Sequence, residues 1–116
     1  MVVIQYPKCS TCKKALKWLK DNNIHYMERH IKENPPTVEE LAQWQKKSGL
    51  PLKRFFNTSG LLYREQGLSA KLPTLSATEQ LAILASDGMM VKRPIVVTEE
   101  TVLLGFKEKE WAAALK

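Results

Sequence analysis

No uninterrupted apolar run in the 116-residue chain approaches the roughly 18 to 20 residues that a membrane-spanning helix needs. The chain also lacks the basic region and long apolar stretch of a signal peptide, because it goes straight into the short run Val2-Val3-Ile4. These absences argue against membrane insertion and against secretion. We therefore expect a cytoplasmic protein with no membrane partner.

Cysteine is scarce as well. The sequence holds only Cys9 and Cys12, and a disulfide between residues three apart closes too small a loop to stabilise a secreted scaffold. A structural zinc ion normally has four protein ligands, and the two histidines, His25 and His30, have no ligand-like spacing from the cysteines. We therefore expect no bound metal or cofactor, assign the histidines no role, and interpret the cysteines as a reactive pair.

Acidic residues are fewer than basic ones, 12 against 18, which gives a net charge of +6. Part of this excess lies at Lys13, Lys17 and Lys20, whose spacing places them on one solvated helix face opposite Leu16 and Leu19. No aromatic residue interleaves these lysines to form the stacking platform that nucleic acid would need. The charge permits an acidic partner, but we expect no direct binding of nucleic acid.

The beginning of the chain has the pattern of a strand, a helix and a second strand. Val2-Val3-Ile4 is a short apolar run with two β-branched residue types, which is typical of a buried strand. Helical periodicity follows over about 10–21, and Asn22-Asn23 separates it from a second strand near 25–29. Such a βαβ unit has parallel strands and a right-handed crossover.

The middle of the chain predicts helices, and its end predicts a hairpin and a last helix. Two capping boxes, in which Thr37 pairs with Glu40 and Ser76 with Glu79, mark helix starts. Helices are expected over 38–47, 52–55 and 63–66, and another runs from the Ser76 capping box to about 86. Strands are expected over 95–97 and 102–104, and a final helix over 107–115. This order predicts one α/β domain over 1–116 with a thioredoxin-like fold, a small central mixed sheet and a helical insertion at about 36–88.

The cysteine pair stands where the first strand ends and the first helix begins. A thiolate there faces unpaired backbone N–H groups and the positive end of the helix dipole, and Lys8, Lys13 and Lys14 add positive charge nearby. We expect Cys9 to be the more exposed, attacking thiol and Cys12, one turn further on, to resolve a mixed disulfide. The alternative is that both cysteines are buried and act as small apolar residues.

Arg93 and Pro94 form the second candidate feature. Pro94 opens an expected strand, which is a position where a cis X-Pro bond can occur. Arg93 has two interpretations: it holds an anionic substrate group or stabilises the Cys9 thiolate, or it forms an ordinary surface ion pair. The residues by themselves leave both interpretations open.

Four segments of the chain carry a resemblance to a known family. They are Tyr6–Cys12, Glu33–Thr37, Leu52–Gly60 and Lys92–Val97. Together they are similar to the arsenate reductase family that includes the transcriptional regulator Spx, and the resemblance covers nearly the whole chain. It implies a thioredoxin-like fold with a helical insertion, a nucleophilic Cys9, and Arg93 placed before a cis Pro94 that presents backbone to the substrate.

Two departures from that family bear on function. Glutaredoxin-coupled arsenate reductases use one cysteine and several oxyanion-binding arginines, whereas the arginines expected near Asn57 and Gly105 are replaced here and only Arg93 is clearly kept. Cys12 instead is similar to the second cysteine of the redox switch in Spx-type regulators, which bind the C-terminal domain of the RNA polymerase α subunit.

Three hypotheses follow from the sequence. The first is a thiol-disulfide oxidoreductase that acts on a redox partner or a small oxidised substrate and receives electrons from glutathione, glutaredoxin or thioredoxin. The second is an Spx-like regulator in which oxidation of the pair alters binding to the RNA polymerase α subunit. The third is a glutaredoxin- or thioredoxin-coupled arsenate reductase with Arg93 as its anion anchor.

Overall fold

A computed structural model describes all residues from 1 to 116. Its centre is a four-stranded sheet in the order β2-β1-β3-β4, made of β1 (Val2–Gln5), β2 (Met27–His30), β3 (Ile95–Val97) and β4 (Val102–Leu104). Strand β1 is parallel to β2 and antiparallel to β3, and β3 is antiparallel to β4. The predicted small mixed sheet is confirmed.

Successive side chains of the inner strands point to opposite faces of the sheet, so each face has its own core. Ile4 and Ile95 are partners in the β1–β3 register, and both belong to the larger of two apolar clusters. Val3 and Val96 are also partners, but they face the other way and pack in the smaller cluster with Trp111. All five side chains are fully buried.

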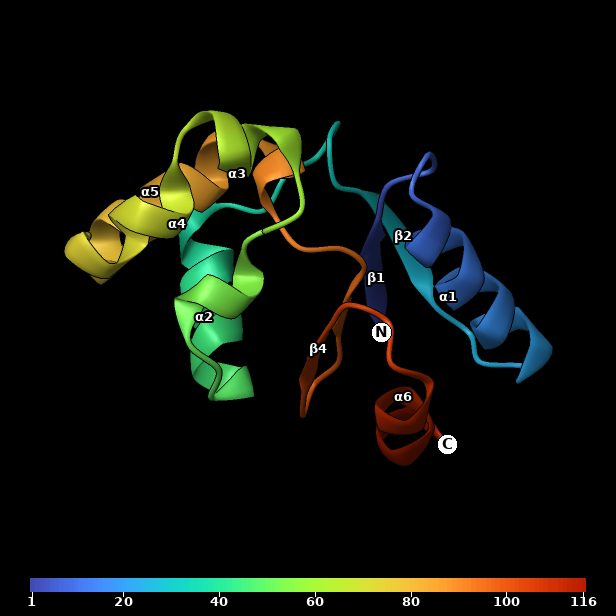
Figure 1. Cartoon of the computed structure of the whole chain (residues 1–116). Coiled ribbons are helices and arrows are strands. Elements are labelled where there is room, and N and C mark those ends of the chain that lie inside the picture. Colours follow the sequence, from blue (N-terminus) through green and yellow to red (C-terminus); the bar gives the residue numbers. More distant parts are fainter.

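One face of the sheet is covered by α1 (Ser10–Asp21) and α6 (Glu108–Leu115), the blue and red helices of Figure 1. Ala15 and Leu19 of α1 and Trp111 of α6 are fully buried against this face, as their helical spacing predicts. No helix of the protein combines the length and the apolar character needed to cross a membrane.

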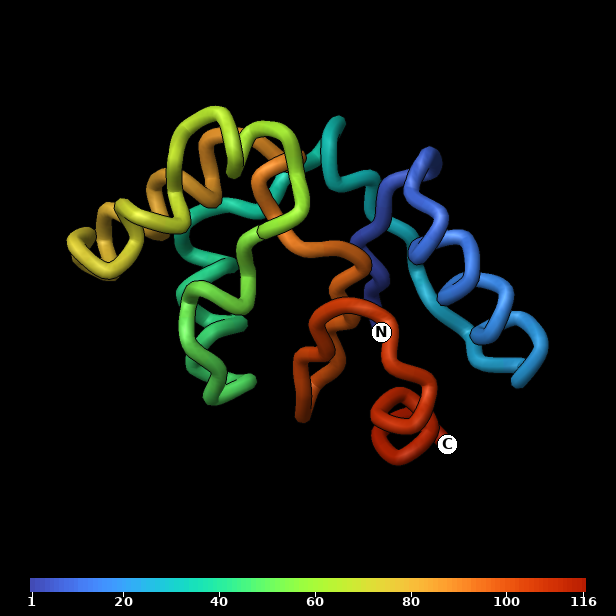
Figure 2. The backbone as a smooth tube through the Cα atoms, in the orientation of Figure 1, coloured from blue at the N-terminus to red at the C-terminus, as the bar shows by residue number.

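The other face is covered by a helical segment, residues 38–90, which the chain enters after β2 and leaves before β3 (Figure 2). Capping boxes at Thr37 and Ser76 start its two longest helices, as predicted. The elements of the helical segment are α2 (Val38–Ser48), the 3-10 helix η1 (Leu52–Phe55), α3 (Leu61–Glu65), α4 (Leu68–Lys71), η2 (Leu72–Thr74), α5 (Ala77–Ser86) and η3 (Gly88–Met90). The predicted order of βαβ, helical insertion and ββα is confirmed.

Three element boundaries differ from the predictions. Strand β2 begins at Met27, two residues late, because Asn23 turns the chain with a φ of 56° and pairing with β1 starts only at Met27. The helix expected over 63–66 becomes the two short helices α3 and α4, which Gly67 separates with a φ of 60°. Lys107 has extended backbone angles and precedes α6 instead of lying within it.

Two sets of contacts join the helical segment to the sheet. Arg29 of β2 donates to both carboxylate oxygens of Glu40, at 2.6 and 2.8 Å, and the pair ties α2 to the edge strand. Further along, the Lys92 N–H donates to the Phe55 carbonyl oxygen at 2.7 Å. This second contact places Lys92 and Arg93 against the end of η1.

Candidate functional site

Cys9 is the N-cap residue of α1. Its backbone has extended angles, and its Sγ accepts a hydrogen bond from the Cys12 backbone N–H at 3.4 Å. The Cys9 backbone N–H donates to the Tyr6 carbonyl oxygen at 3.0 Å, which closes the turn between β1 and α1. The sulfur of Cys9 therefore takes the place of the oxygen that usually caps a helix, at the positive end of the helix dipole.

The two cysteines differ in exposure in the way that the sequence predicts. Cys9 is half-buried, whereas Cys12 has no exposed surface and lies in the first turn of α1. Both are free thiols. The alternative in which both cysteines are buried apolar residues is therefore wrong for Cys9.

The pKa values of the two thiols move in opposite directions. Burial alone would raise the pKa of Cys9, but the backbone N–H and side chain of Cys12 together with Arg93 outweigh it and lower the pKa of Cys9 below its ordinary value. Burial, with the neighbouring Cys9 as a second cause, raises the pKa of Cys12 to about 12. Cys9 is thus the thiol that ionises first, while Cys12 keeps its proton.

Arg93 lies beside the cysteines and precedes a cis peptide bond to Pro94. Its guanidinium carbon lies 5.2 Å from the centroid of the Tyr6 ring, and the same ring meets His30 edge-on at 5.7 Å. The Nε and Nη1 atoms of Arg93 are buried and have no hydrogen-bond partner in the protein. No carboxylate pairs with Arg93, so the interpretation as an ordinary surface ion pair is wrong.

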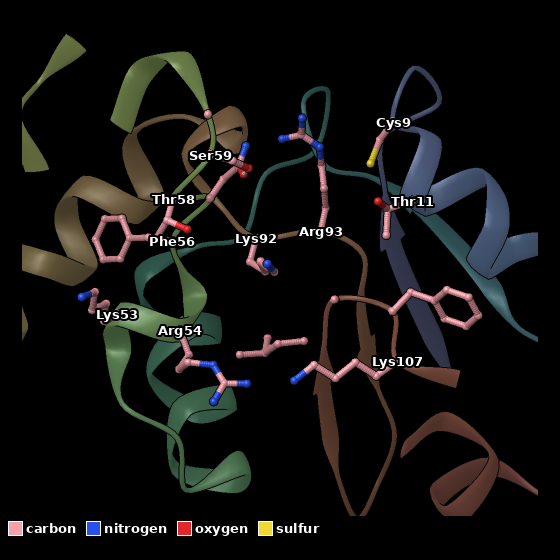
Figure 3. A pocket seen from close by; sticks show the side chains of 15 residues that line it. Cys9, Thr11, Lys53, Arg54, Phe56, Thr58, Ser59, Lys92, Arg93 and Lys107 are labelled. Carbon is pink, nitrogen blue, oxygen red and sulfur yellow. Dashed lines mark hydrogen bonds between the residues drawn. The ribbon is translucent and has the colours of Figure 1, made fainter. Parts of the chain in front are cut away.

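A cavity of about 820 Å³ opens beside Cys9 and Arg93. In Figure 3 the Arg93 side chain extends upward to the same height in the view as Cys9, and Lys92 lies near the centre. The lining holds five basic side chains and no acidic one. The basic residues are Lys53, Arg54, Lys92, Arg93 and Lys107.

The cations of the cavity come from parts of the chain that lie far apart in sequence. Lys53 and Arg54 belong to η1 of the helical segment, Lys92 and Arg93 precede β3, and Lys107 precedes α6. The expectation that Arg93 alone would anchor an anion is therefore incomplete.

The lysines that the sequence places near the cysteine pair do not reach this cavity. Lys8, Lys13 and Lys14 are exposed and are absent from the lining. They sit in the turn before α1 and on its outer surface. The positive charge that acts on Cys9 comes from Arg93 instead.

Comparison with known proteins places the chain in a family. The model of the ArsC family matches residues 4–114. This chain belongs to the ArsC family. It is 54% identical to YusI of Bacillus subtilis over 106 residues, which are 91% of this chain and 90% of YusI. It is 28% identical to the global transcriptional regulator Spx 1 of Bacillus cereus over 90% of this chain and 78% of Spx 1.

Solved structures agree with that assignment. The crystal structure of an ArsC family related protein from Bacteroides fragilis is 58% identical in sequence and superimposes with a TM-score of 0.96. The match covers 99% of this chain and 96% of that protein. The thioredoxin-like fold class predicted from the sequence is therefore confirmed.

Asn57 and Gly105, near which the family resemblance implies that arginines are missing, both line the cavity. Gly105 has a φ of 72°, and a Cβ added there would lie 3.2 Å from Cε of Lys92. In this ArsC family protein the Lys92 side chain therefore packs closely against Gly105, and a Cβ at position 105 would make a tight contact with it.

Four of the five cations were missed by the sequence reasoning, which singled out Arg93 alone. A signal was present, because two of the four segments that carry the family resemblance contain a basic pair, Lys53-Arg54 and Lys92-Arg93.

His30 is also close to the site, although its Nδ1 accepts hydrogen bonds from the backbone of Lys32 and Glu33 and so stabilises the turn after β2. His25 lies outside the lining of the cavity.

Proposed function

We propose that the protein is a cytoplasmic thiol-disulfide oxidoreductase in which Cys9 is the nucleophile and Cys12 the resolving thiol. The contrast between the two thiols carries this proposal. A half-exposed thiol with a lowered pKa is suited to attack, and a buried thiol that keeps its proton, one turn away, is suited to a second, slower exchange. Arg93 stabilises the Cys9 thiolate, and Pro94 presents backbone to the substrate.

The reaction consists of two thiol-disulfide exchanges. The Cys9 thiolate attacks one sulfur of a disulfide, an S–S bond forms between them, and the other half of the substrate leaves as a thiolate. Cys12 then attacks the sulfur of Cys9, its proton passes to the second departing thiolate, and a Cys9–Cys12 disulfide remains. The substrate has gained two electrons, and glutathione, glutaredoxin or thioredoxin returns two electrons to the pair.

Turnover of hydroxyethyl disulfide tests this proposal, with each of the three reductants coupled to oxidation of NADPH. We expect wild-type protein to turn over with at least one reductant and Cys9→Ser to be inactive. Cys12→Ser should accumulate a mixed disulfide at Cys9, because the second exchange is blocked, and mass spectrometry detects the added mass. Absence of turnover with all three reductants would contradict the proposal, as would full activity of Cys9→Ser.

Arsenate reduction is a second candidate, favoured by the basic lining of the cavity and by membership of the ArsC family. In that reaction arsenate accepts two electrons, the pair becomes a disulfide, and one oxygen leaves as water. We expect oxidation of Cys9 that depends on arsenate and falls sharply in Arg93→Ala. Loss of free thiols on addition of arsenate, compared with addition of sulfate, measures it.

An Spx-like regulatory role is the third candidate, supported by the similarity to Spx 1 over most of both chains. It requires binding to the C-terminal domain of the RNA polymerase α subunit and a change in that binding when the cysteine pair is oxidised. A pull-down with the purified domain under reducing and oxidising conditions tests it. Retention that is the same for wild-type and Cys12→Ser under both conditions would contradict a redox switch.

A further inference from the structure

We propose that the disulfide substrate is built from a small thiol that carries phosphate or carboxylate groups, and that the basic cavity binds those groups away from the sulfur. This inference rests on the proposed thiol-disulfide function and names its substrate class. It assigns Arg54 and Lys107 as residues that select the substrate by charge.

The charge of the cavity is the first observation. Five basic side chains and no carboxylate line it, although the whole chain carries 12 acidic residues. Unbalanced cations at close quarters repel one another, and an anionic ligand removes that repulsion. Two N–H groups of Arg93 are buried without an acceptor, which leaves donors ready for such a ligand.

The placement of the cations is the second observation. Arg93 is the cation beside Cys9, while Arg54 and Lys107 come from opposite walls and point toward each other across the cavity in Figure 3. A ligand that reaches both places has its sulfur near Cys9 and an acid group between Arg54 and Lys107. Lys92 lies between the two places in that view and is accommodated by Gly105.

The size and the remaining lining decide between a bare oxyanion and a larger thiol. The volume of about 820 Å³ lies in the upper part of the range for sites that hold small organic molecules, roughly 300 to 1,000 Å³. The side-chain amide N–H groups of Asn57 and the hydroxyl of Thr58 add neutral donors in the segment that follows Arg54. A tetrahedral oxyanion fills little of this space, whereas a thiol with an acidic tail fills much more.

The experiment measures single-turnover oxidation of the Cys9–Cys12 pair by three disulfides. Coenzyme A disulfide carries phosphates, glutathione disulfide carries carboxylates, and hydroxyethyl disulfide is neutral. Each rate constant is divided by that of dithiothreitol with the same disulfide, which corrects for intrinsic reactivity. We expect normalised rates in the order coenzyme A, glutathione, hydroxyethyl, and a preference for the acidic disulfides that weakens with added salt.

Two double variants test the assignment of residues. Arg54→Gln/Lys107→Gln should lower the ratio of the coenzyme A rate to the hydroxyethyl rate by about tenfold, as expected for two charge-assisted hydrogen bonds partly screened by water. Lys46→Gln/Lys109→Gln removes the same total charge from exposed positions outside the cavity and should leave the ratio unchanged. Equal ratios in the two variants would overturn the assignment, and equal normalised rates for the three disulfides would overturn the substrate class.

Binding without chemistry separates this inference from the proposed function. Cys9→Ser cannot exchange disulfides but keeps the cavity. Reduced coenzyme A should bind this variant in calorimetry, and the further changes Arg54→Gln/Lys107→Gln should abolish that binding. If binding occurs but no disulfide oxidises the wild-type pair, the proposed function fails alone. If disulfides oxidise the pair without regard to charge and no binding is seen, the substrate class fails alone.

Discussion

Replacing Trp111 by Phe removes one buried hydrogen bond beside the candidate site. The indole Nε1 donates to the Gly105 carbonyl oxygen at 3.0 Å, and the Gly105 N–H in turn donates to the carbonyl oxygen of Pro94 at 2.8 Å. The Trp111 ring is fully buried and packs edge-on against Phe106 at 4.8 Å between centroids. The Trp111 side chain therefore joins α6 to the loop after β4, and it is this loop that lines the cavity.

The expected loss of stability has two parts. A buried carbonyl left without its donor costs about 1 to 3 kcal/mol. The smaller ring leaves a void that costs about 1 kcal/mol more. For a chain of this size, about 4 °C of melting temperature corresponds to 1 kcal/mol. We therefore expect Trp111→Phe to lose about 3 kcal/mol of unfolding free energy and about 12 °C of melting temperature.

Urea unfolding followed by circular dichroism measures this loss, with Trp18→Phe as the matched control. Trp18 packs on the same aromatic group, but it is only half-buried and its indole N–H makes no hydrogen bond within the protein. The control should lose about 1 kcal/mol or less. If the two variants lose the same free energy with unchanged m-values, the Trp111–Gly105 hydrogen bond does not stabilise the protein as argued.

Two other predictions concern charged groups. Tyr6→Leu removes the ring whose centroid lies 5.2 Å from the Arg93 guanidinium carbon, so alkylation of Cys9 by iodoacetamide at pH 7 should slow. Tyr6→Phe keeps the ring and should keep the wild-type rate. Equal rates for the two variants would contradict a positioning role of the ring. Arg29, mainly through its side-chain hydrogen bond, lowers the pKa of Glu40 below its ordinary value of 4.5, so the stability from this pair is present above about pH 4.5 and is lost as the pH falls below it. Arg29→Met should therefore lose about 1 kcal/mol at pH 7 and clearly less at pH 3 in urea unfolding, and an equal loss at both pH values would contradict the linkage.

Much of the fold is predictable from local signals. The alternation of Val3 and Ile4 between two faces, the helical spacing of Ala15 and Leu19, and the capping boxes each act over a few residues. The errors arise where a neighbouring element decides the outcome. Pairing with β1 sets where β2 begins, which no local pattern of the strand itself records.

The candidate site is likewise predictable from the sequence only in part. Cys9 and Cys12 are recognisable because they are neighbours in sequence and stand at a strand-to-helix junction. The basic cavity is not recognisable in the sequence, because Arg54, Lys92 and Lys107 come together only after the helical segment folds against the sheet. The family resemblance implies arginines near Asn57 and Gly105 that this chain lacks, and, apart from Arg93, it does not indicate the cations that line the cavity.

The pH dependence of Cys9 alkylation in reduced protein tests whether the start of α1 and Arg93 activate this thiol. Iodoacetamide rates are measured from pH 5 to 10, with Cys12→Ser to isolate Cys9 and Cys9→Ser to isolate Cys12. We predict that Cys9 titrates below the ordinary thiol value of about 8.5 and that Cys12 stays protonated and unreactive across the range. A Cys9 that titrates at or above the ordinary value, or a Cys12 that reacts as fast as Cys9, would contradict it.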